Sequence, residues 1–415
     1  MTAAVRGGGI TLLFLAGIMA LYVGISANIG RSRTAMAAPI LNGCIDVLHH
    51  GGDNGGVRDN SAAFRAAMDV SEGDAVCIYF PAGIYRFSSS PTMSLPVAAG
   101  HGGAAITIIG DGSELSKLQF DPEISGLVLR LNGPQQSFHI RDLSILAGSK
   151  AKAVTGLSII QENARTPNPA QSDISGVSIR GQDGFGAQFS FERGIFLHQV
   201  SNVNVMNTVI AGSSDGAPYA SQGTCLYIDG AVSSIPVQIN IVGSQINYCG
   251  RGIYYGPYVQ GLQVLGSNFV GNGTAIYQSS DSKGNDQLAV VGSQFNSGER
   301  NILLGAPIDG VLLSGNDFYL SGTGISSIEM PGVQFAIQGN SFIQLGAARA
   351  TAIAIGPFLL DAGVITGNSF QNFNTAIVLQ PRSSRVNVQS NAYSDIGSDK
   401  VVDRGHGNTV GGGSI

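Results

Sequence analysis

Several side chains between residues 183 and 251 have the chemistry needed to move protons or to neutralise a charged ligand. They are Asp183, Glu192, His198, Asp215, Asp229 and Arg251. A histidine beside a carboxylate is suited to general acid–base catalysis, and two carboxylates about 5 to 10 Å apart are what hydrolysis of a glycosidic bond requires. This region offers two possible carboxylate pairs, in which Asp229 is the partner of either Asp215 or Glu192. Whether these residues meet depends on the elements that carry them.

Aromatic residues recur in the same region. They are Phe196, Tyr227, Tyr254 and Tyr277. Aromatic rings bind the apolar faces of sugars, and a tyrosine hydroxyl adds a polar contact. With Arg251 they are the candidate substrate-binding residues. Packing of the same rings against a sheet or beneath an inserted loop is an equally good explanation of the pattern.

An internal repeat of about 24 residues organises the second half of the chain. An apolar-x-apolar-x-Gly-x-x-aromatic phrase returns as LQVLGSNF, LAVVGSQF, VLLSGNDF, FAIQGNSF and GVITGNSF, with INIVGSQI before it and VNVQSNAY after it. Short alternating apolar segments between Gly, Asn and Ser, without a helical period, indicate strands joined by turns. A unit this short cannot bury its own apolar face, so successive units must stack.

Stacking places equivalent side chains above one another at the strand spacing of about 4.8 Å. We therefore predict an internal column formed by Phe269, Phe295, Phe318, Phe342 and Phe370, and a hydrogen-bonded column formed by Asn316, Asn340, Asn368 and Asn391. The predicted fold class is all-β: a single-stranded right-handed parallel β-helix, since parallel crossovers are almost always right-handed. A leucine-rich repeat has a similar period, but these repeats lack the helical segment of its convex side.

A second phrase of the repeat fixes which side chains point outwards. Its inward residues are predicted to be Leu226, Ile253, Ile276, Ile302, Ile325, Ile353 and Ile377, with weaker copies at Leu157 and Ile195. Strand side chains alternate, so the residues one and three positions later point to solvent. The aromatic residues named above then form one outward column over successive coils. In the next column His198 and Asp229 lie side by side.

The ends of such a stack expose open sheet edges that need protection. Residues 62–70 have the pattern of a short helix that Asn60 or Ser61 would cap, and we predict that this capping helix covers the first coil. The β-helix is predicted to span residues 38–404. The glycine-rich tail 405–415 is predicted to be flexible.

Composition excludes several classes of protein. The chain has 415 residues, 43% hydrophobic and only 12% charged, so it is able to bury a large core. Lys+Arg number 22 and Asp+Glu 27 without a basic run, which argues against a nucleic-acid partner. The 59 glycines do not recur at every third position, so the chain is not collagen-like. No acidic cluster able to hold calcium occurs, and the sequence predicts neither a metal nor a cofactor.

The N-terminal residues 1–37 have the features of an export segment. Residues 10–25 (ITLLFLAGIMALYVGI) are apolar, and an A-M-A triplet at 35–37 matches a cleavage site. Arg31 and Arg33 lie between them, so the alternatives are an uncleaved membrane anchor through residues 10–25 and earlier cleavage near Ser26 or Ala27. In all of these cases we expect the body of the chain to be exported, to the periplasm, the cell surface or the medium.

Four cysteines would find oxidising conditions there. They are Cys44, Cys77, Cys225 and Cys249. Pairing of sequence neighbours is the simplest of the three possible connectivities. The sequence does not choose among them.

Part of the N-terminal half resembles a known family. Residues 51–69 (GGDNGGVRDNSAAFRAAMD), 77–87 (CIYFPAGIYRF) and 106–112 (ITIIGDG) resemble the N-terminal module of the pectate-lyase superfamily, which includes polygalacturonase-like and rhamnogalacturonase-like enzymes and bacteriophage tailspikes. The module would occupy residues 40–120, and the resemblance implies the right-handed parallel β-helix. It implies no single reaction, because this module precedes hydrolases, lyases, epimerases and non-catalytic binders.

Two functions stay open at this point. The superfamily's hydrolase motifs are incomplete, because the chain has no Asp-Asp dipeptide and no Arg-Ile-Lys. The first function is an exported enzyme of the pectate-lyase-like class that cleaves a polysaccharide by hydrolysis or β-elimination. The second is a non-catalytic surface or polysaccharide-binding β-helix, in which His198 and Asp229 form an ordinary ion pair and Asp183 and Asp215 support turns. Nothing in the sequence fixes an oligomeric state.

Overall fold

The computed structural model describes residues 43–70, 75–95, 104–133, 135–150, 153–162, 171–214, 219, 222–322, 324–331, 334–346, 350–356 and 362–411. The chain divides into two units, Met1–Asn42 and Gly43–Ile415. The first unit, with the predicted export segment, lies outside the described residues. Among the residues that are described, every helix is too short or too polar to span a bilayer.

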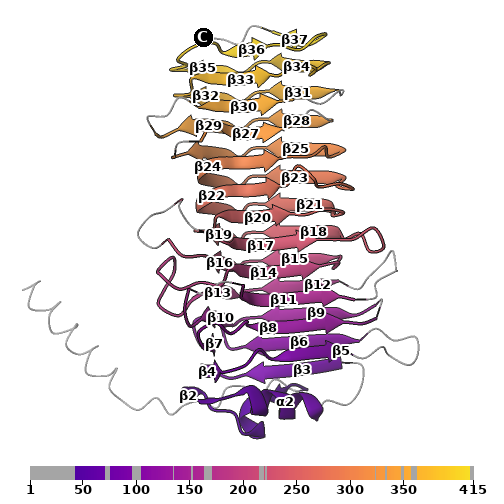
Figure 1. Cartoon of the computed structure of the whole chain (residues 1–415), viewed down its shortest axis with the longest axis vertical. Helices are drawn as coiled ribbons and strands as arrows, with labels where there is room; N and C mark the ends of the chain where they lie inside the picture. Colours follow the sequence, from indigo (N-terminus) through magenta and orange to yellow (C-terminus); the bar gives the residue numbers. More distant parts are fainter. Residues whose placement is uncertain are drawn as a thin grey trace, which may run out of the picture. The chain divides into compact units, whose positions relative to one another are not determined.

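The second unit is an all-β parallel solenoid of the right-handed type (Figure 1), as the sequence predicts. Its described strands form a 14-stranded sheet and a 23-stranded sheet, and the latter turns a corner within two long strands to make two faces. Each complete coil therefore contributes one strand to each of three faces, and the incomplete coils at the two ends contribute fewer. All pairings between neighbouring coils in the described strands are parallel, and they keep their register apart from local shifts between Gly55 and Asp59 and between Val270 and Thr274.

The strands of each face follow the chain from the N-terminal coil onwards. Face 1 consists of β1 (Ile45–Asp46), β3 (Ala75–Phe80), β6 (Ala105–Gly110), β9 (Ser137–Arg141), β12 (Ser172–Ser175), β15 (Val203–Met206), β18 (Val237–Val242), β21 (Gln260–Leu265), β23 (Gln287–Val291), β25 (Gly310–Ser314), β28 (Phe335–Gln338), β31 (Gly363–Thr366), β34 (Val386–Gln389) and β37 (Thr409–Val410). Face 2 consists of β2 (Gly55–Asp59), β4 (Gly83–Phe87), β7 (Ser116–Phe120), β10 (Ser144–Ala147), β13 (Ser178–Gly181), β16 (Val209–Ala211), β19 (Gln245–Asn247), the first parts of β22 (Asn268–Gln278) and β24 (Gln294–Leu304), β26 (Asp317–Leu320), β29 (Ser341–Gln344), β32 (Ser369–Gln371) and β35 (Ala392–Ser394). Face 3 consists of β5 (Thr92–Leu95), β8 (Leu127–Leu131), β11 (Thr155–Gln161), β14 (Arg193–His198), β17 (Thr224–Asp229), β20 (Arg251–Tyr255), the last parts of β22 and β24, β27 (Ser326–Met330), β30 (Thr351–Ile355), β33 (Thr375–Leu379) and β36 (Val401–Asp403).

The repeat glycine makes the turn from face 1 to face 2. It has a left-handed backbone, with φ +64° at Gly315 and +66° at Gly367, which glycine adopts without strain. The aromatic residue after the turn points into the core, and the predicted phenylalanine column is confirmed. Its rings stack with centroids 4.7 Å apart for Phe269 and Phe295 and 5.0 Å apart for Phe342 and Phe370.

The predicted asparagine column is also confirmed. Asn316 Nδ2 donates to Asn340 Oδ1 at 2.9 Å, and Asn340 Nδ2 donates to Asn368 Oδ1 at 2.9 Å. Each amide also donates to a backbone carbonyl of a neighbouring coil, as Asn340 does to Leu313 O at 3.0 Å. The column is buried, so its hydrogen bonds satisfy groups that water does not reach.

Asn340→Ala is expected to lower the free energy of unfolding by about 3 kcal/mol, because it leaves several buried donors and acceptors without partners. The backbone N–H and side chain of Asn316 both donate to Asn340 Oδ1 in the native protein. Denaturant unfolding followed by circular dichroism measures the change. Gln389→Ala removes an exposed amide from face 1 and serves as the control. Equal midpoint shifts for the two variants would contradict a stabilising column.

The structure corrects one inward position of the second phrase. The residue aligned with Ile302 and Ile353 is Ile328, not Ile325. Ile328 is fully buried, whereas Ile325 is 74% exposed. The two isoleucines are three residues apart, and both come shortly after a turn. Because this turn is longer, the second isoleucine, Ile328, takes the inward position. The outward residue of this coil is therefore Glu329.

The predicted helix is α2 (Ser61–Asp69). Asn60 occupies the N-cap position, but its side chain makes no capping hydrogen bond. Its amide instead accepts from Asp53 N and donates to Arg86 O. The helix start is served by Asp59, whose carboxylate accepts from Ser61 N.

Two further features follow from the described residues. The disulfides are Cys44–Cys77 and Cys225–Cys249, which is the simplest connectivity. In the tail predicted to be flexible, β37 pairs with β34 of the preceding coil.

Candidate functional site

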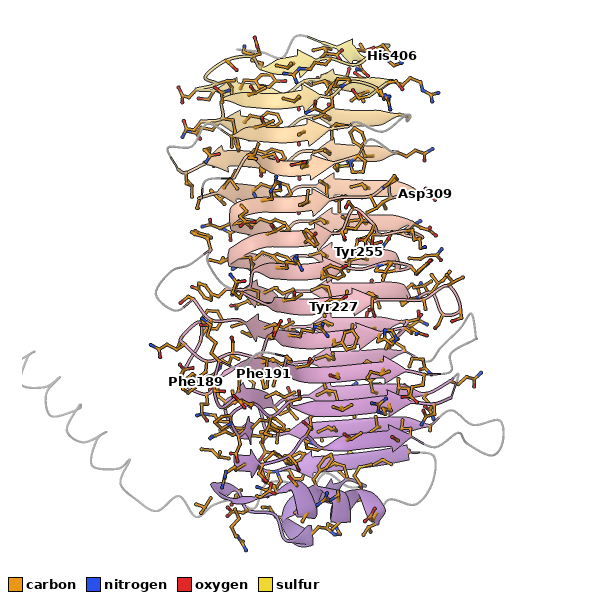
Figure 2. The ribbon with its side chains drawn as sticks, in the orientation of Figure 1. Phe189, Phe191, Tyr227, Tyr255, Asp309 and His406 are labelled. Atoms are coloured by element: carbon orange, nitrogen blue, oxygen red, sulfur yellow. A yellow bond between two sulfur atoms is a disulfide. The ribbon has the colours of Figure 1, made fainter. Side chains whose placement is uncertain are left out.

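Face 3 carries two outward columns that come directly from strand register. One column alternates between arginine and threonine: Arg193, Thr224, Arg251, Thr274 and Arg300. The other is the predicted aromatic column, Phe196, Tyr227, Tyr254 and Tyr277, which the register confirms. Figure 2 labels Tyr227 about midway along the solenoid. Arg193 and Arg251 each lie near the aromatic residue three positions later on the same strand, Phe196 and Tyr254.

The rings of the aromatic column do not present their faces to solvent as we expected. Tyr227 and Tyr254 stack on each other, with centroids 4.4 Å apart and an angle of 14° between ring planes. Their faces are therefore occupied, and a ligand meets ring edges and hydroxyl groups. Phe196 lies nearly perpendicular to Tyr227, at 73°. Burial raises the pKa of Tyr227 to about 12, so its phenol remains protonated at neutral pH.

The arginines lie over these rings. The guanidinium carbon of Arg193 is 4.8 Å from the Tyr227 ring centroid, and that of Arg251 is 4.2 Å from the Tyr277 centroid. Such contacts hold an arginine in place without neutralising its charge. Arg300 differs, because its Nε donates to Glu329 Oε2 at 3.0 Å. This column therefore holds two arginines whose described contacts include no ion pair, beside one, Arg300, whose charge is compensated.

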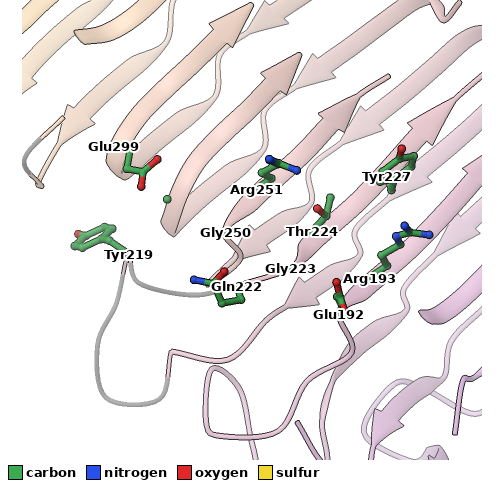
Figure 3. A pocket seen from close by; sticks show the side chains of 11 residues that line it. Glu192, Arg193, Tyr219, Gln222, Gly223, Thr224, Tyr227, Gly250, Arg251 and Glu299 are labelled. Carbon is green, nitrogen blue, oxygen red and sulfur yellow. The ribbon is translucent and has the colours of Figure 1, made fainter. Parts of the chain in front are cut away.

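An open hollow of about 460 Å³ lies beside the arginine column (Figure 3). Its lining consists of Glu192, Arg193, Tyr219, Gln222, Gly223, Thr224, Tyr227, Gly250, Arg251, Gly273 and Glu299. One row of the lining consists of the residues that come directly before the arginine–threonine column. Its three middle members are glycines: Gly223, Gly250 and Gly273. Glu192 and Glu299 are the two ends of the row. At Gly223 a Cβ would lie 2.4 Å from Glu192 O, and at Gly273 it would lie 2.8 Å from Gly250 O, so the close approach of the coils requires glycine at both positions. A cavity of this size and polarity suits a hydrophilic ligand of a few rings.

His198 and Asp229 form the pair that the sequence predicts. They are aligned in adjacent strands, and His198 Nδ1 is 2.6 Å from Asp229 Oδ1. The hydrogen bond to Asp229 raises the pKa of His198, and burial opposes the rise only in part. When Nδ1 donates to Asp229, Nε2 keeps a lone pair, and it lies 2.8 Å from Gln199 Nε2. A substrate would have to displace the Gln199 amide to reach that nitrogen.

We expect His198 to titrate above its ordinary pKa of 6.5. Its protonated form is favoured in the folded state, so the pair adds stability that is fully present below pH 6.5 and is lost as pH rises through the folded pKa. Nuclear magnetic resonance of the imidazole protons across this range measures the titration. Asp229→Asn is expected to move the midpoint down. An unchanged midpoint in this variant would refute the coupling.

The other predicted catalytic residues do not join this pair. Asp183 accepts backbone hydrogen bonds from Gln188 and Phe189, so it supports its own turn. Glu192 accepts from Ala153 N and lines the hollow at the other end of β14. The position of Glu192 along the strand is about 20 Å from that of Asp229, which is too far for a glycosidase pair. Asp215 lies outside the described residues.

Sequence reasoning missed Thr224, Glu299, Tyr219 and Gln222 as lining residues. A signal for the first two was present, because the positions two and three residues before the inward aliphatic residue carry the arginine–threonine alternation and the glutamate-bounded glycine row. Tyr219 and Gln222 come from an irregular segment outside the repeat, so the repeat spacing does not predict where they lie. Within the described residues, no group of three or more His, Cys, Asp and Glu side chains is placed to hold a metal ion.

A second histidine–aspartate pair lies on face 1. His139 Nδ1 is 2.5 Å from Asp173 Oδ1, and Arg141 donates to both oxygens of the same carboxylate. Burial acts to raise the pKa of Asp173, but the hydrogen bonds from Arg141 and His139 outweigh it and leave the pKa lowered. Arg141 donates hydrogen bonds to both carboxylate oxygens of Asp173. This histidine–aspartate pair does not line the hollow on face 3.

Comparisons with known proteins agree with the fold. No curated protein has a significant sequence match to the chain. The A-module of the Azotobacter vinelandii mannuronan C-5 epimerase AlgE4 is similar in structure, with a TM-score of 0.65 and 17% identity, covering 88% of this chain and 100% of that one. The Agl-KA catalytic domain has a TM-score of 0.52 and 17% identity, covering 91% of this chain and 69% of that one. The N-terminal fragment of bacteriophage phi29 gene product 12 has a TM-score of 0.52 and 13% identity, covering 94% and 74%.

At these identities the solved structures show a shared fold and no more. The sequence match is more specific. The profile of a family described as rhamnogalacturonase A/epimerase, pectate lyase-like, matches residues 44–256, which is more than half of the 415 residues. The chain therefore belongs to the rhamnogalacturonase A/epimerase, pectate lyase-like family.

Proposed function

We propose that this protein binds an acidic polysaccharide along face 3 and modifies it by a reaction that begins with removal of a proton. The observation that carries the proposal is the arrangement around Phe196. In β14, the Arg193 guanidinium carbon is 5.4 Å from the Phe196 ring centroid, and the His198 ring centroid is 5.7 Å from the Phe196 ring centroid. A uronate residue at the edge of Phe196, between these two side chains, would direct its carboxylate to Arg193 and, once the Gln199 amide is displaced, a ring C–H to His198 Nε2.

These groups have complementary chemical roles. A guanidinium that neutralises the uronate carboxylate stabilises the negative charge that develops when the adjacent carbon loses its proton. Neutral His198 would accept the proton at Nε2, and Asp229 would stabilise the imidazolium that forms. Tyr227, which is protonated at neutral pH, is a hydrogen-bond donor for sugar hydroxyls.

The geometry supports proton abstraction more than hydrolysis. Hydrolysis requires two carboxylates about 5 to 10 Å apart. Glu192 comes just before β14, whereas Asp229 ends the neighbouring strand β17, so the two carboxylates lie near opposite ends of this strand pair. Proton abstraction needs one base and one charge-neutralising group, and both are present. In β-elimination the C–H electrons form a double bond, the bond to the leaving sugar oxygen breaks, and that oxygen takes up a proton. In epimerisation the proton returns to the opposite face of the same carbon.

Incubation with purified polyuronates and neutral polysaccharides tests this proposal. We expect reaction with polyuronates only, detected as ultraviolet absorbance of unsaturated uronates or as a changed sugar configuration in nuclear magnetic resonance spectra. New reducing ends without unsaturation would indicate hydrolysis and overturn the mechanism. Binding without reaction would establish the alternative, a non-catalytic polysaccharide-binding protein.

We also propose that the protein acts outside the cytoplasm. The disulfides Cys44–Cys77 and Cys225–Cys249 support this, since such bonds persist in oxidising compartments. Fractionation of expressing cells, with the thiols blocked before lysis, checks both location and oxidation. Recovery of reduced protein from the cytoplasm would contradict export.

At the N-terminal end of the second unit, we propose that α2 closes the core as a capping helix. Phe64 stacks with Phe80 at a centroid distance of 6.0 Å and meets Phe87 edge-on at 6.3 Å. These contacts support a role in covering the first coils.

A further inference from the structure

Face 1 changes character along the stack. Its earlier strands include charged residues, such as Arg141 in β9 and Asp173 in β12. From β15 to β37 its strands contain no Asp, Glu, Lys, Arg or His. One outward column of this part reads Gln263, Ala289, Leu312, Ala336, Val364 and Asn387. We call the outward surface of β15 to β37 the neutral face.

The neutral face is unusual for this chain. The other faces keep charged residues over the same coils, such as Asp317 in β26 and Glu329 in β27. Outward side chains of a sheet make no contact with the core, so folding does not require them to be uncharged. Leu312 is nevertheless 36% exposed in the middle of this surface. Removing such a surface from water costs little, because it holds no charge to desolvate.

We propose that the neutral face binds a second copy of this chain, face to face, in a twofold-symmetric dimer. Charge favours this occupant: each copy has a net charge of -5, and the neutral face is where two copies approach without placing like charges together. The area is sufficient. Nine strands spaced by about 4.8 Å, each with about four residues in the sheet, span roughly 600 Å² per copy, or roughly 1,200 Å² in total, which exceeds the ~1,000 Å² of a stable interface.

The middle of the neutral face has features of an interface centre. β25 is its central strand in sheet order, so in a twofold arrangement, with the stacks parallel or antiparallel, β25 faces β25 of the second copy. A hollow of about 480 Å³ adjoins Leu312 and is lined in part by Ala289, Val311 and Phe335. The Leu312 side chain of the second copy is of a size to enter this hollow. Buried apolar anchors near the centre dominate the energy of many interfaces.

Sedimentation analysis of the full chain over a range of concentrations tests the proposal. We expect the wild type to be a dimer and Leu312→Lys to raise the dimer dissociation constant at least about tenfold, because two like charges meet at the symmetry axis. Ile325→Lys is the matched control: it places the same charge at an isoleucine that is 74% exposed and outside the neutral face. All variants keep the same apolar N-terminal segment, so differences between them report the substitutions.

A charge-reversal experiment separates loss of contact from loss of folding. Leu312→Lys and Leu312→Asp are each expected to be monomeric alone, and their equimolar mixture is expected to form heterodimers. A wild type that remains monomeric at the highest concentration would overturn the proposal and leave the face open to another occupant. So would an Ile325→Lys variant that dissociates as readily as Leu312→Lys.

Discussion

Replacing both Arg193 and Arg251 with glutamine is expected to weaken the binding of a polyuronate oligosaccharide about 100-fold. A hydrogen bond to a charged group contributes about 1.5 to 3 kcal/mol, and 1.4 kcal/mol corresponds to a tenfold change in affinity. Each guanidinium is held over aromatic rings in an open hollow, and neither is described in an ion pair. Glutamine keeps much of the length and polarity, so the difference reports the charge. Calorimetric titration with oligouronates of defined length measures it.

Arg300 provides the matched control for this prediction. It belongs to the same outward column, but Glu329 already compensates its charge. Arg300→Gln is expected to change the affinity less than twofold. If Arg300→Gln weakened binding as much as the double replacement, the loss would reflect general surface charge, and the column would not be a specific site. Higher salt should reduce the effect of Arg193 and Arg251, since both are partly exposed to solvent.

The register of the site was predictable because, in a solenoid, residues at equivalent positions of successive repeats are paired in neighbouring coils. Neighbouring coils pair in parallel, so His198 and Asp229 had to meet once the phrase around Leu226 was aligned with that around Ile195. The same reasoning predicted the stack of Phe269 on Phe295. In such a fold, the repeat period alone predicts which residues of neighbouring coils are in contact.

Side-chain orientation was not predictable from the same pattern. Register places Tyr227 beside Tyr254, but it does not say whether the rings lie flat on the sheet or against each other. They stack on each other because ring-on-ring contact at the strand spacing buries more apolar area than the sheet surface offers. The choice of Ile325 over Ile328 failed for a different reason. A turn of unequal length left two candidates in the same pattern, and only burial distinguishes them.

Asp229→Asn is expected to lower the turnover of a polyuronate about a thousandfold with little change in binding. A positioned acid–base group contributes about 10²- to 10⁴-fold. Asparagine keeps the shape of the carboxylate but cannot stabilise an imidazolium at His198, which accepts a proton in the proposed reaction. His198→Gln removes the base itself and should cause a similar loss. Initial rates at saturating substrate, with affinities measured separately, give both quantities.

The two losses should not add, because Asp229 acts through His198. A double variant with Asp229→Asn and His198→Gln is expected to be no slower than His198→Gln alone. His139→Gln is the control, since His139 contacts Asp173 in the same way on face 1, and Arg141 still satisfies that carboxylate. It should leave turnover unchanged.

The pH dependence gives an independent test of the same relation. The base must be neutral, so turnover should rise with pH through the pKa of His198, which Asp229 holds above its ordinary value. In Asp229→Asn the residual turnover should rise at a lower pH, because the favourable interaction with the protonated ring is lost. A profile that did not move would mean that the rate reports some other group, and the pair on face 3 would then be structural, as the pair on face 1 is.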